Sequence, residues 1–423
     1  TLAGPVSGTG SLTKLGLGHL ILEGDNTFSG GSTLGTGTTN SSTNDTASAS
    51  SGGFVHIRRS SALGTGKITA KGAQIRALTP ELVIANEIEI NQGAFRFGGT
   101  NDLSFIGPVT LVGGNREIGN YSVDRTLTFN GPLNLGANNL NIMAVGNAPA
   151  NGTTVFNGPI AGSGTLIVNA SYDNGTVVFT ADNGVTFTGN VELNAGTTSI
   201  THTNALGRTG TILMNESGAT LELADGMVFA RNVTIGNGGN NKAIGTAAGA
   251  TAEYAGTITI QETTANYFDF APKTGSTLCF SGDIGACAIP AIEKQGEGTL
   301  VLPTAKNFSG TFTLGSGTAN TSWDGTASAG SGGYVAVGHA DAFGTALINA
   351  KGAQLQALVS GLVITNAFTV DNGALRFSGS NDLELSGPVT MTNGGTRGIG
   401  NYSGNRSLTL SGTVTSQDGI SFV

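Results

Sequence analysis

Short runs of alternating apolar and polar residues recur along the whole chain. Examples are residues 126–129 (TLTF), 176–180 (TVVFT) and 256–260 (GTITI), each flanked by Gly, Asn, Asp or Ser or by a turn that contains them. A period of two predicts half-buried β-strands joined by tight turns. No stretch has apolar residues at the three-and-four spacing of a helix, so the pattern predicts an all-β protein.

The spacing of these runs selects among all-β architectures. Apolar pairs recur about every 8 to 12 residues, and no proline-rich break or block of charge interrupts the pattern. Sandwiches and barrels close within about 100 to 250 residues, whereas this chain has 423. A β-solenoid can extend through that length, because each coil stacks on the previous one at about 4.8 Å.

The chain also contains a long internal duplication. Residues 28–125 return as 308–406, and the string AKGAQ stands at 70–74 and again at 350–354, an offset of 350 − 70 = 280. The copies keep their glycines and alternate apolar positions, which indicates a geometric building unit. We therefore predict three segments: a repeat block at 1–134, a variant solenoid segment at 135–278 and a second repeat block at 279–423.

Within both copies, a string of the form Lys-x-Gly-x-Gly-x-Leu-x-Leu precedes Phe-Ser-Gly, as in LTKLGLGHLILEGDNTFSGGSTLGTGT and EKQGEGTLVLPTAKNFSGTFTLGSGT. Here the sequence resembles the autotransporter-associated β-strand repeat (passenger-associated transport repeat) of bacterial surface proteins. The resemblance is clearest at 11–37, 62–78, 187–223 and 294–358.

That resemblance implies a right-handed parallel β-helix that is exported and displayed outside the cell, and it implies no single activity. The predicted fold class is thus all-β, a right-handed parallel β-helix (β-solenoid) forming an elongated rod. The predicted location is extracellular or on the bacterial cell surface.

Composition argues against several other classes. Glycine numbers 69, but without the strict three-residue period of collagen. Charged residues make up 11% and the net charge is −8, so the chain lacks the basic stripe that nucleic-acid binding needs. The sequence contains no run of 18 apolar residues, so it predicts no transmembrane segment.

The sequence offers few catalytic candidates. The strongest are Asp102 and Asp382, in an Asn-Asp-Leu string that both copies keep, because glycoside cleavage needs two carboxylates at a defined separation. A second acid is missing, since Glu117 has no carboxylate counterpart, and Asn-Asp is also favourable turn chemistry. His339 with Asp341 could form half of a triad, but the first copy has Arg and Ser there. We predict no catalytic, cofactor or metal site.

The other polar positions kept by both copies are interpreted as structural. Arg96 and Arg376 stand on predicted strands, and we expect them to lie outward or to pair with Asp102 or Asp382 in the neighbouring coil. The tyrosines of the two IGNYS strings are expected to cap the apolar stack at a corner.

Two further features concern the surface and the cysteines. Residues 38–52 and 318–332 are rich in Ser, Thr and Gly and are expected to be exposed insertions. Cys279 and Cys287 lie eight residues apart and have no counterparts in the first copy. A local disulfide and a pair of buried thiols are both compatible with this spacing.

The two ends of the chain carry apolar residues in mid-pattern. An unpaired strand edge invites pairing with another chain, and a head-to-tail contact that does not close gives a filament. We therefore expect either further repeats beyond the ends or an end-to-end contact made by Leu2, Val6, Ile420, Phe422 and Val423.

Together these observations predict an extracellular structural or adhesive β-helical surface protein, part of a cell-surface filament or of a longer passenger rod, and not an enzyme. The expected partners are the chain itself or further repeats, and a glycan or a host or cell surface is a further candidate. The alternative is a secreted β-helical polysaccharide-degrading enzyme, because a groove on one face of such a helix can hold carboxylates.

Overall fold

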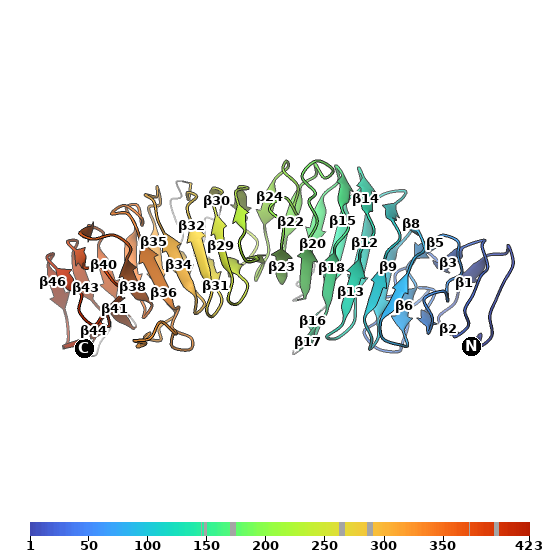
Figure 1. The fold of residues 1–423 in the computed structure, drawn as a ribbon, viewed down its shortest axis with the longest axis horizontal. Coiled ribbons are helices and arrows are strands. Elements are labelled where there is room, and N and C mark those ends of the chain that lie inside the picture. Colours follow the sequence, from blue (N-terminus) through green and yellow to red (C-terminus); the bar gives the residue numbers. More distant parts are fainter. Residues whose placement is uncertain are drawn as a thin grey trace. The chain divides into compact units, whose positions relative to one another are not determined.

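A computed structural model of the chain consists of β-strands and connecting turns, with no helix in the part of the chain that it describes. The chain divides into two compact units, Thr1–Ile212 and Leu213–Val423. Within each unit, parallel strands stack turn upon turn (Figure 1), which confirms the predicted β-solenoid. The described residues are 1–144, 146–147, 150–169, 175–261, 267–285, 291–371, 373–392 and 397–423.

Three parallel sheets build the first unit, and successive strands of a turn enter different sheets. The first sheet contains β1 (Leu12–Lys14), β3 (Ser32–Gly35), β5 (Ile68–Lys71), β8 (Ile88–Ile90), β11 (Val109–Leu111), β14 (Leu133–Gly136) and β19 (Ile160–Gly162). The second contains β2 (His19–Leu22), β4 (Phe54–Ile57), β6 (Gln74–Ala77), β9 (Ala94–Gly98), β12 (Arg116–Asn120), β15 (Leu140–Ala144), β20 (Leu166–Val168) and β22 (Val191–Leu193). The third contains β7 (Leu82–Ile84), β10 (Leu103–Phe105), β13 (Thr126–Phe129), β18 (Thr153–Phe156), β21 (Thr176–Phe179) and β23 (Thr197–Ile200), and a short antiparallel pair adds β16 (Gly146–Asn147) and β17 (Ala150–Asn151).

The second unit repeats this construction. One run of strands contains β25 (Thr220–Leu223), β28 (Lys242–Thr246), β31 (Tyr267–Pro272), β33 (Ala291–Lys294), β35 (Thr311–Leu314), β37 (Leu347–Ala350), β40 (Phe368–Val370), β43 (Val389–Met391) and β46 (Val414–Ser416). Another contains β26 (Val228–Phe229), β29 (Thr251–Tyr254), β32 (Thr277–Phe280), β34 (Thr299–Leu302), β36 (Tyr334–Val337), β38 (Gln354–Ala357), β41 (Ala374–Ser378), β44 (Arg397–Asn401) and β47 (Ile420–Phe422). Shorter runs join β24 (Ile212–Met214), which begins on the last residue of the first unit, with β27 (Val233–Ile235) and β30 (Ile258–Ile260), and β39 (Leu362–Ile364) with β42 (Leu383–Leu385) and β45 (Leu408–Leu410).

The core is made of identical positions stacked in register. Phe105 pairs with Phe129, Phe129 with Phe156 and Phe156 with Phe179, and all four side chains are buried. Their ring centroids are 5.6, 5.3 and 5.4 Å apart, and the rings are stacked. Since successive side chains of a strand point to opposite faces, the residues between these phenylalanines point outward. The period of two in the sequence thus becomes a continuous apolar column.

Glycine at one corner allows the backbones of successive turns to approach each other closely. Gly107, Gly131 and Gly158 each precede a proline and stack one turn apart. A Cβ on Gly131 would collide with the carbonyl oxygen of Gly107, and one on Gly158 with that of Gly131. Only glycine fits at such a close approach of one backbone to another.

The duplicated residues pair in the same register in both copies. Ile118 of β12 pairs with Phe95 of β9, and at the equivalent place Ile399 of β44 pairs with Leu375 of β41. The duplication seen in the sequence is therefore also a repetition of strand pairing. The boundaries of the three predicted segments stay a prediction.

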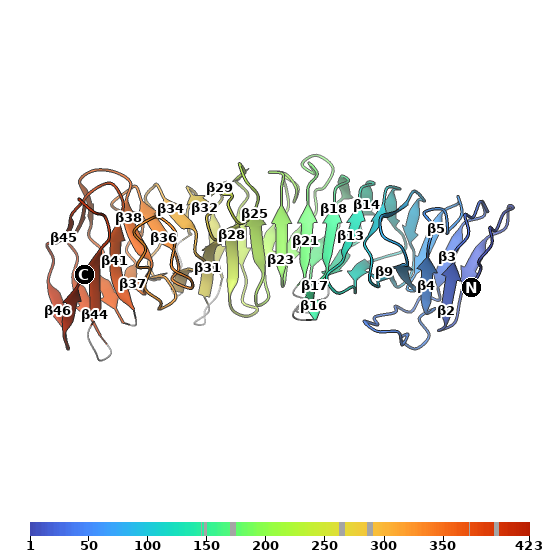
Figure 2. The ribbon, with the colours of Figure 1, turned by 60° about the horizontal axis from the view of Figure 1, so that its bottom comes forward.

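One long loop in each copy leaves the stacked strands. Residues 38–52 lie between β3 and β4 (Figure 2, blue), and residues 318–332 lie between β35 and β36 (Figure 1, orange). Most of their residues are exposed or half-buried, but each loop is tied at its base by a buried asparagine. The Nδ2 groups of Asn40 and Asn320 donate to the carbonyl oxygens of Gly53 and Gly333, both at 3.0 Å.

The phenylalanine column makes a testable prediction about stability. Phe156→Ala should lower the melting temperature of the chain, because it opens a cavity between two stacked rings and should cost about 3–5 kcal/mol locally. Val185→Ala is the control, since that side chain is 82% exposed, and it should have little effect. Equal effects of the two substitutions in thermal denaturation followed by circular dichroism would contradict the stacked core.

Candidate ligand-binding groove

The outer face of β36, β38 and β41 carries polar and aromatic side chains. Strand alternation directs Val335, Leu355 and Phe377 into the core. Their neighbours Tyr334 and Gln354 therefore point outward, and the strand register aligns these two across adjacent turns. The solenoid thus displays, turn by turn, a column of side chains that the core does not constrain.

The loop at 318–332 lies over this face and is fixed at its base. The buried Nζ of Lys294 donates to the carbonyl oxygens of Gln295, Gly296 and Gly332 at 2.8, 2.8 and 2.6 Å. Burial lowers the pKa of Lys294 to about 7. The three carbonyl acceptors match the three donors of an ammonium group. This lysine ties the end of the loop to the turn that precedes it.

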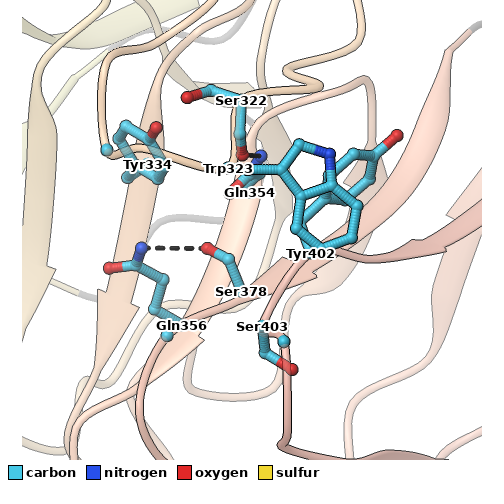
Figure 3. A pocket seen from close by; sticks show the side chains of 11 residues that line it. Ser322, Trp323, Tyr334, Gln354, Gln356, Ser378, Tyr402 and Ser403 are labelled. Carbon is cyan, nitrogen blue, oxygen red and sulfur yellow. Dashed lines mark hydrogen bonds between the residues drawn. The ribbon is translucent and has the colours of Figure 1, made fainter.

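The loop and the outer face enclose a groove of about 350 Å³ (Figure 3). Trp323 at the loop tip is 64% exposed and packs against Tyr402, with ring centroids 4.7 Å apart and planes inclined by 54°. Opposite them, Nε2 of Gln356 donates to Oγ of Ser378 at 2.9 Å. The lining residues are Ser322, Trp323, Gly325, Tyr334, Gln354, Gln356, Ser378, Gly379, Tyr402, Ser403 and Gly404.

Two polar atoms of the groove lack a partner among the described residues. They are the hydroxyl oxygen of Tyr334 and Oε1 of Gln354, and both side chains are buried. The Gln354 amide is held in place because its Nε2 donates to the carbonyl oxygens of Asn320 and Ser322 at 3.0 and 2.8 Å. A buried hydroxyl and a buried amide oxygen need hydrogen-bond partners from water or from a ligand.

The equivalent face of the first copy is filled by an arginine. Arg76 stands where the second copy has Gln356; it pairs with Asp45, and its Nε donates to Oε1 of Gln74 at 2.7 Å. Its guanidinium lies 4.1 Å from the ring centre of Phe54. Asp45 corresponds to a glycine in the second copy, and Thr43 corresponds to Trp323. The groove therefore results from a few substitutions on an unchanged scaffold.

The carboxylates proposed from the sequence as catalytic candidates serve the backbone. Oδ1 of Asp102 accepts the N–H of Thr126 at 2.8 Å, and Oδ1 of Asp382 accepts the N–H of Ser407 at 2.7 Å, each one turn further along the chain. Such hydrogen bonds hold one turn against the next. This arrangement matches the turn chemistry that the Asn-Asp string indicated.

Arg96 lies on the outer side of its strand, as one of the two expectations stated, because Phe95 and Phe97 beside it point into the core. The alternative pairing of Arg96 with Asp102 is wrong. Arg96 forms an ion pair with Glu117, because β12 stacks directly on β9 and brings Glu117 beside it. The tyrosines of the IGNYS strings also do not cap the apolar stack. The ring centre of Tyr121 lies 4.6 Å from the guanidinium carbon of Arg96, on the outer side of the sheet.

Two of the four histidines lie close together in space, and a third lies near an aspartate. Nδ1 of His339 lies 3.8 Å from the carboxylate of Asp341, and both side chains are exposed in a turn. Nδ1 of His19 and Nε2 of His56 are only 2.8 Å apart, which stacking of β4 on β2 produces and sequence spacing could not reveal. The described part of the chain holds no group of three or more metal-ligating side chains.

The structure brings together two acidic residues that the sequence pattern does not connect. Asp269 on β31 and Glu293 on β33 are register partners, 24 residues apart in the sequence. Asp269 is 9% exposed, and its Oδ1 lacks a partner within the described ranges. Burial, and then the charge of Glu293, raise the pKa of Asp269 to about 7. Only the register of the turns brings the two carboxyl groups together.

The predicted end-to-end contact residues are accessible. Leu2 and Val6 are exposed on the first turn, where Leu2 forms a bridge to Leu22. Phe422, 73% exposed, lies on β47, the last strand of its sheet, and Ile420 and Val423 flank it.

Of the two cysteines for which a disulfide and a pair of buried thiols were both left open, Cys287 lies outside the described residues. Cys279 is half-buried on β32, and burial raises the pKa of its thiol. The pairing of the two cysteines stays a prediction.

The fold and the groove define a parallel β-solenoid with a ligand-sized groove on one outer face. In sequence, the chain is similar to the adhesin BmaC autotransporter of Brucella suis biovar 1 (strain 1330), with 27% identity over 226 residues. The aligned part covers 47% of this chain and 6% of that protein. This similarity and the β-solenoid fold confirm the predicted resemblance to autotransporter passengers.

Other comparisons add no relative. No family model matches the chain, and no solved structure matches it. Across the described ranges, no helix has the length and apolar character needed to cross a membrane.

The raised pKa of Asp269 predicts a pH-dependent stability. The unfolded pKa of aspartate is about 3.9, so the folded chain holds this proton more tightly. The contribution of this proton to the free energy of unfolding is complete below about pH 4 and is lost as pH rises through about 7. Asp269→Asn should therefore raise the melting temperature at pH 8 and change it little at pH 4.

Glu293→Gln is the matched comparison for this prediction. It removes the charge of Glu293, which is the smaller cause of the raised pKa of Asp269, and should raise the melting temperature at pH 8 by less than Asp269→Asn does. If Asp269→Asn instead lowered stability at pH 8, the carboxylate would have a partner, and the account of this site would be incorrect.

Proposed function

We propose that the chain is an adhesive, surface-displayed β-solenoid of a bacterial cell and that its groove binds a saccharide. Two observations support the adhesive role and the location: the similarity to an autotransporter adhesin and the solenoid fold. The observation that carries the ligand class is the exposed Trp323–Tyr402 pair beside a set of amide and hydroxyl groups.

This combination suits a sugar. A pyranose ring has a face of C–H groups, which pack on the negative face of an aromatic ring, and a rim of hydroxyl groups, which need donors and acceptors. Trp323 supplies the ring face, and Gln356, Ser378 and Ser403 supply polar groups around it. Apolar walls with a few placed polar groups are what small-molecule sites generally present.

A non-enzymatic role is part of the proposal. The alternative of a polysaccharide-degrading enzyme was first linked to Asp102 and Asp382, whose carboxylates accept backbone N–H groups. The Asp269–Glu293 pair supports it better, since the raised pKa of Asp269 would suit a general acid. Asp269 is largely buried, however, so a glycosidic oxygen could reach it only after the outer face opened. Asp269→Asn tests this alternative as well. An enzyme would lose turnover of its polysaccharide, whereas a scaffold would show no turnover before or after the substitution.

We also propose that the terminal turns pair with further solenoid turns, supplied either by another copy of the chain or by further repeats of a longer passenger rod. The support is the exposed apolar edge of β47 together with exposed Leu2 and Val6. Parallel strands can add to such an edge through main-chain hydrogen bonds. Phe422→Asp should shift purified protein from filaments to single molecules in electron micrographs, with Val185→Asp as a control at an exposed site away from the ends. Unassembled wild-type protein at high concentration would reject pairing between copies and leave further repeats as the partner of these turns.

The groove makes the central prediction about binding. On an array of immobilised oligosaccharides, the wild-type chain should bind a subset of sugars, and Trp323→Ala should weaken that binding at least tenfold, since aromatic anchors dominate contacts of this kind. Thr43→Ala is the matched control, because Thr43 occupies the equivalent place in the first copy. Absence of binding to every sugar, or equal binding by wild type and Trp323→Ala, would refute the proposal.

A further inference from the structure

The two copies differ in how they neutralise one buried arginine. In the first copy, the Arg96 side chain is 3% exposed and pairs with Glu117. Its counterpart in the second copy is Arg376, which is also buried, at 9% exposure. Glu117, however, corresponds to Gly398. The second copy has kept the cation and lost its carboxylate.

No other group in the described residues replaces that carboxylate. Nε and Nη1 of Arg376 have no hydrogen-bond partner there, and no ion pair involves this arginine among them. Its guanidinium carbon lies 5.4 Å from the ring centre of Tyr402. A cation–π contact offsets only part of the cost of burying a charge. An external anion therefore gains more interaction energy at an unpaired buried cation than at a cation on the surface.

The place left by the missing side chain is next to the guanidinium. A Cβ on Gly398 would lie 3.3 Å from Nη2 of Arg376, 3.6 Å from its Nη1 and 3.7 Å from the Cβ of Ala374, with no other atom nearer. A carboxylate above Gly398 would therefore meet the same fork of donors that Glu117 meets in the first copy. Two parallel N–H donors of arginine match the two oxygens of a carboxylate.

Tyr402 connects this place to the groove. Its ring contacts Trp323 in the groove and also faces the guanidinium of Arg376. The register of β38 and β41 pairs Arg376 with Gln354, whose Oε1 is one of the unpartnered atoms of the groove. The aromatic surface and the unpaired cation thus adjoin one another on the same outer face.

We propose that the groove selects acidic saccharides, and that a sugar carboxylate takes the position above Gly398 that Glu117 occupies in the first copy. This inference rests on the proposed saccharide binding and adds the charge of the ligand to it. The sugar ring packs on Trp323 and Tyr402, and the carboxylate forms an ion pair with Arg376. A hexuronate and a sialate share this chemistry.

The first experiment uses the unmodified chain. Calorimetric titration compares an oligogalacturonate with its methyl ester, and a sialylated oligosaccharide with the methyl ester of its sialate. Each comparison removes the negative charge of the carboxylate and keeps the sugar ring. At least one acidic member should bind tenfold or more tightly than its neutral counterpart, and the pair that shows this identifies the source of the carboxylate. Equal affinities within both pairs would overturn the inference.

The second experiment supplies the missing carboxylate from the protein. Gly398→Glu should form the ion pair of the first copy and bring the affinity for the acidic sugar down to that for its neutral form. Gly398→Gln is the matched control, because it has nearly the same size without the charge, and it should keep the preference for the acidic sugar. Gly398 is not among the glycines with a positive φ, so its backbone accepts a side chain once the end of the flexible Arg376 side chain shifts slightly.

The outcomes separate this inference from the proposed function. Sugar binding that depends on Trp323 but is indifferent to the carboxylate, or equal effects of Gly398→Glu and Gly398→Gln, would reject the acidic preference and leave saccharide binding intact. Absence of any sugar binding by the wild-type chain would reject both. Circular dichroism of each variant verifies that the stacked turns persist, and the ligand comparison on the wild-type chain needs no variant.

Discussion

Every other feature of this structure depends on one constraint, the in-register stacking of parallel turns. Each strand hydrogen-bonds to the equivalent strand of the next turn, so a residue meets its own counterpart above and below. The phenylalanine column from Phe105 to Phe179 and the glycine corner from Gly107 to Gly158 are two results of the same repetition. A change of one residue in register would turn the apolar column outward. Inward positions are therefore restricted, and outward positions are free to differ.

The duplicated segments show what that freedom can produce. Both copies keep the buried lysine, asparagine and glutamine that hold the long loop, at Lys14, Asn40 and Gln74 and at Lys294, Asn320 and Gln354. Between these fixed points, Arg76 and Asp45 fill the face in the first copy, while Gln356 and Gly325 leave it open in the second. A groove on a solenoid thus needs no new backbone. It needs a few outward side chains to be shortened and one aromatic residue, Trp323, to be added.

The sequence predicted the scaffold well because a repeated pattern of period two carries its own geometry. It could not predict the groove, because the residues that form it come from one loop and from strands of successive turns, between Ser322 and Gly404, and only their stacking brings them together. The pairing of Arg96 with Asp102 failed for the same reason: Asp102 is near in sequence, but the adjacent turn places Glu117 beside the guanidinium. One signal was available in the sequence. Thr43, Arg76 and Glu117 change to Trp, Gln and Gly between otherwise parallel copies, and all three changes fall at or beside the groove.

We have proposed the outer face of the second copy, and not the core or the ends, as the place where this solenoid binds its ligand. A crystal structure of the chain with a bound oligosaccharide would locate that ligand. Binding in the groove should give electron density for a sugar ring against Trp323 and Tyr402, with the phenylalanine core unchanged. A sugar bound instead on the first copy beside Arg76, or at the exposed edge of β47, would contradict this proposal.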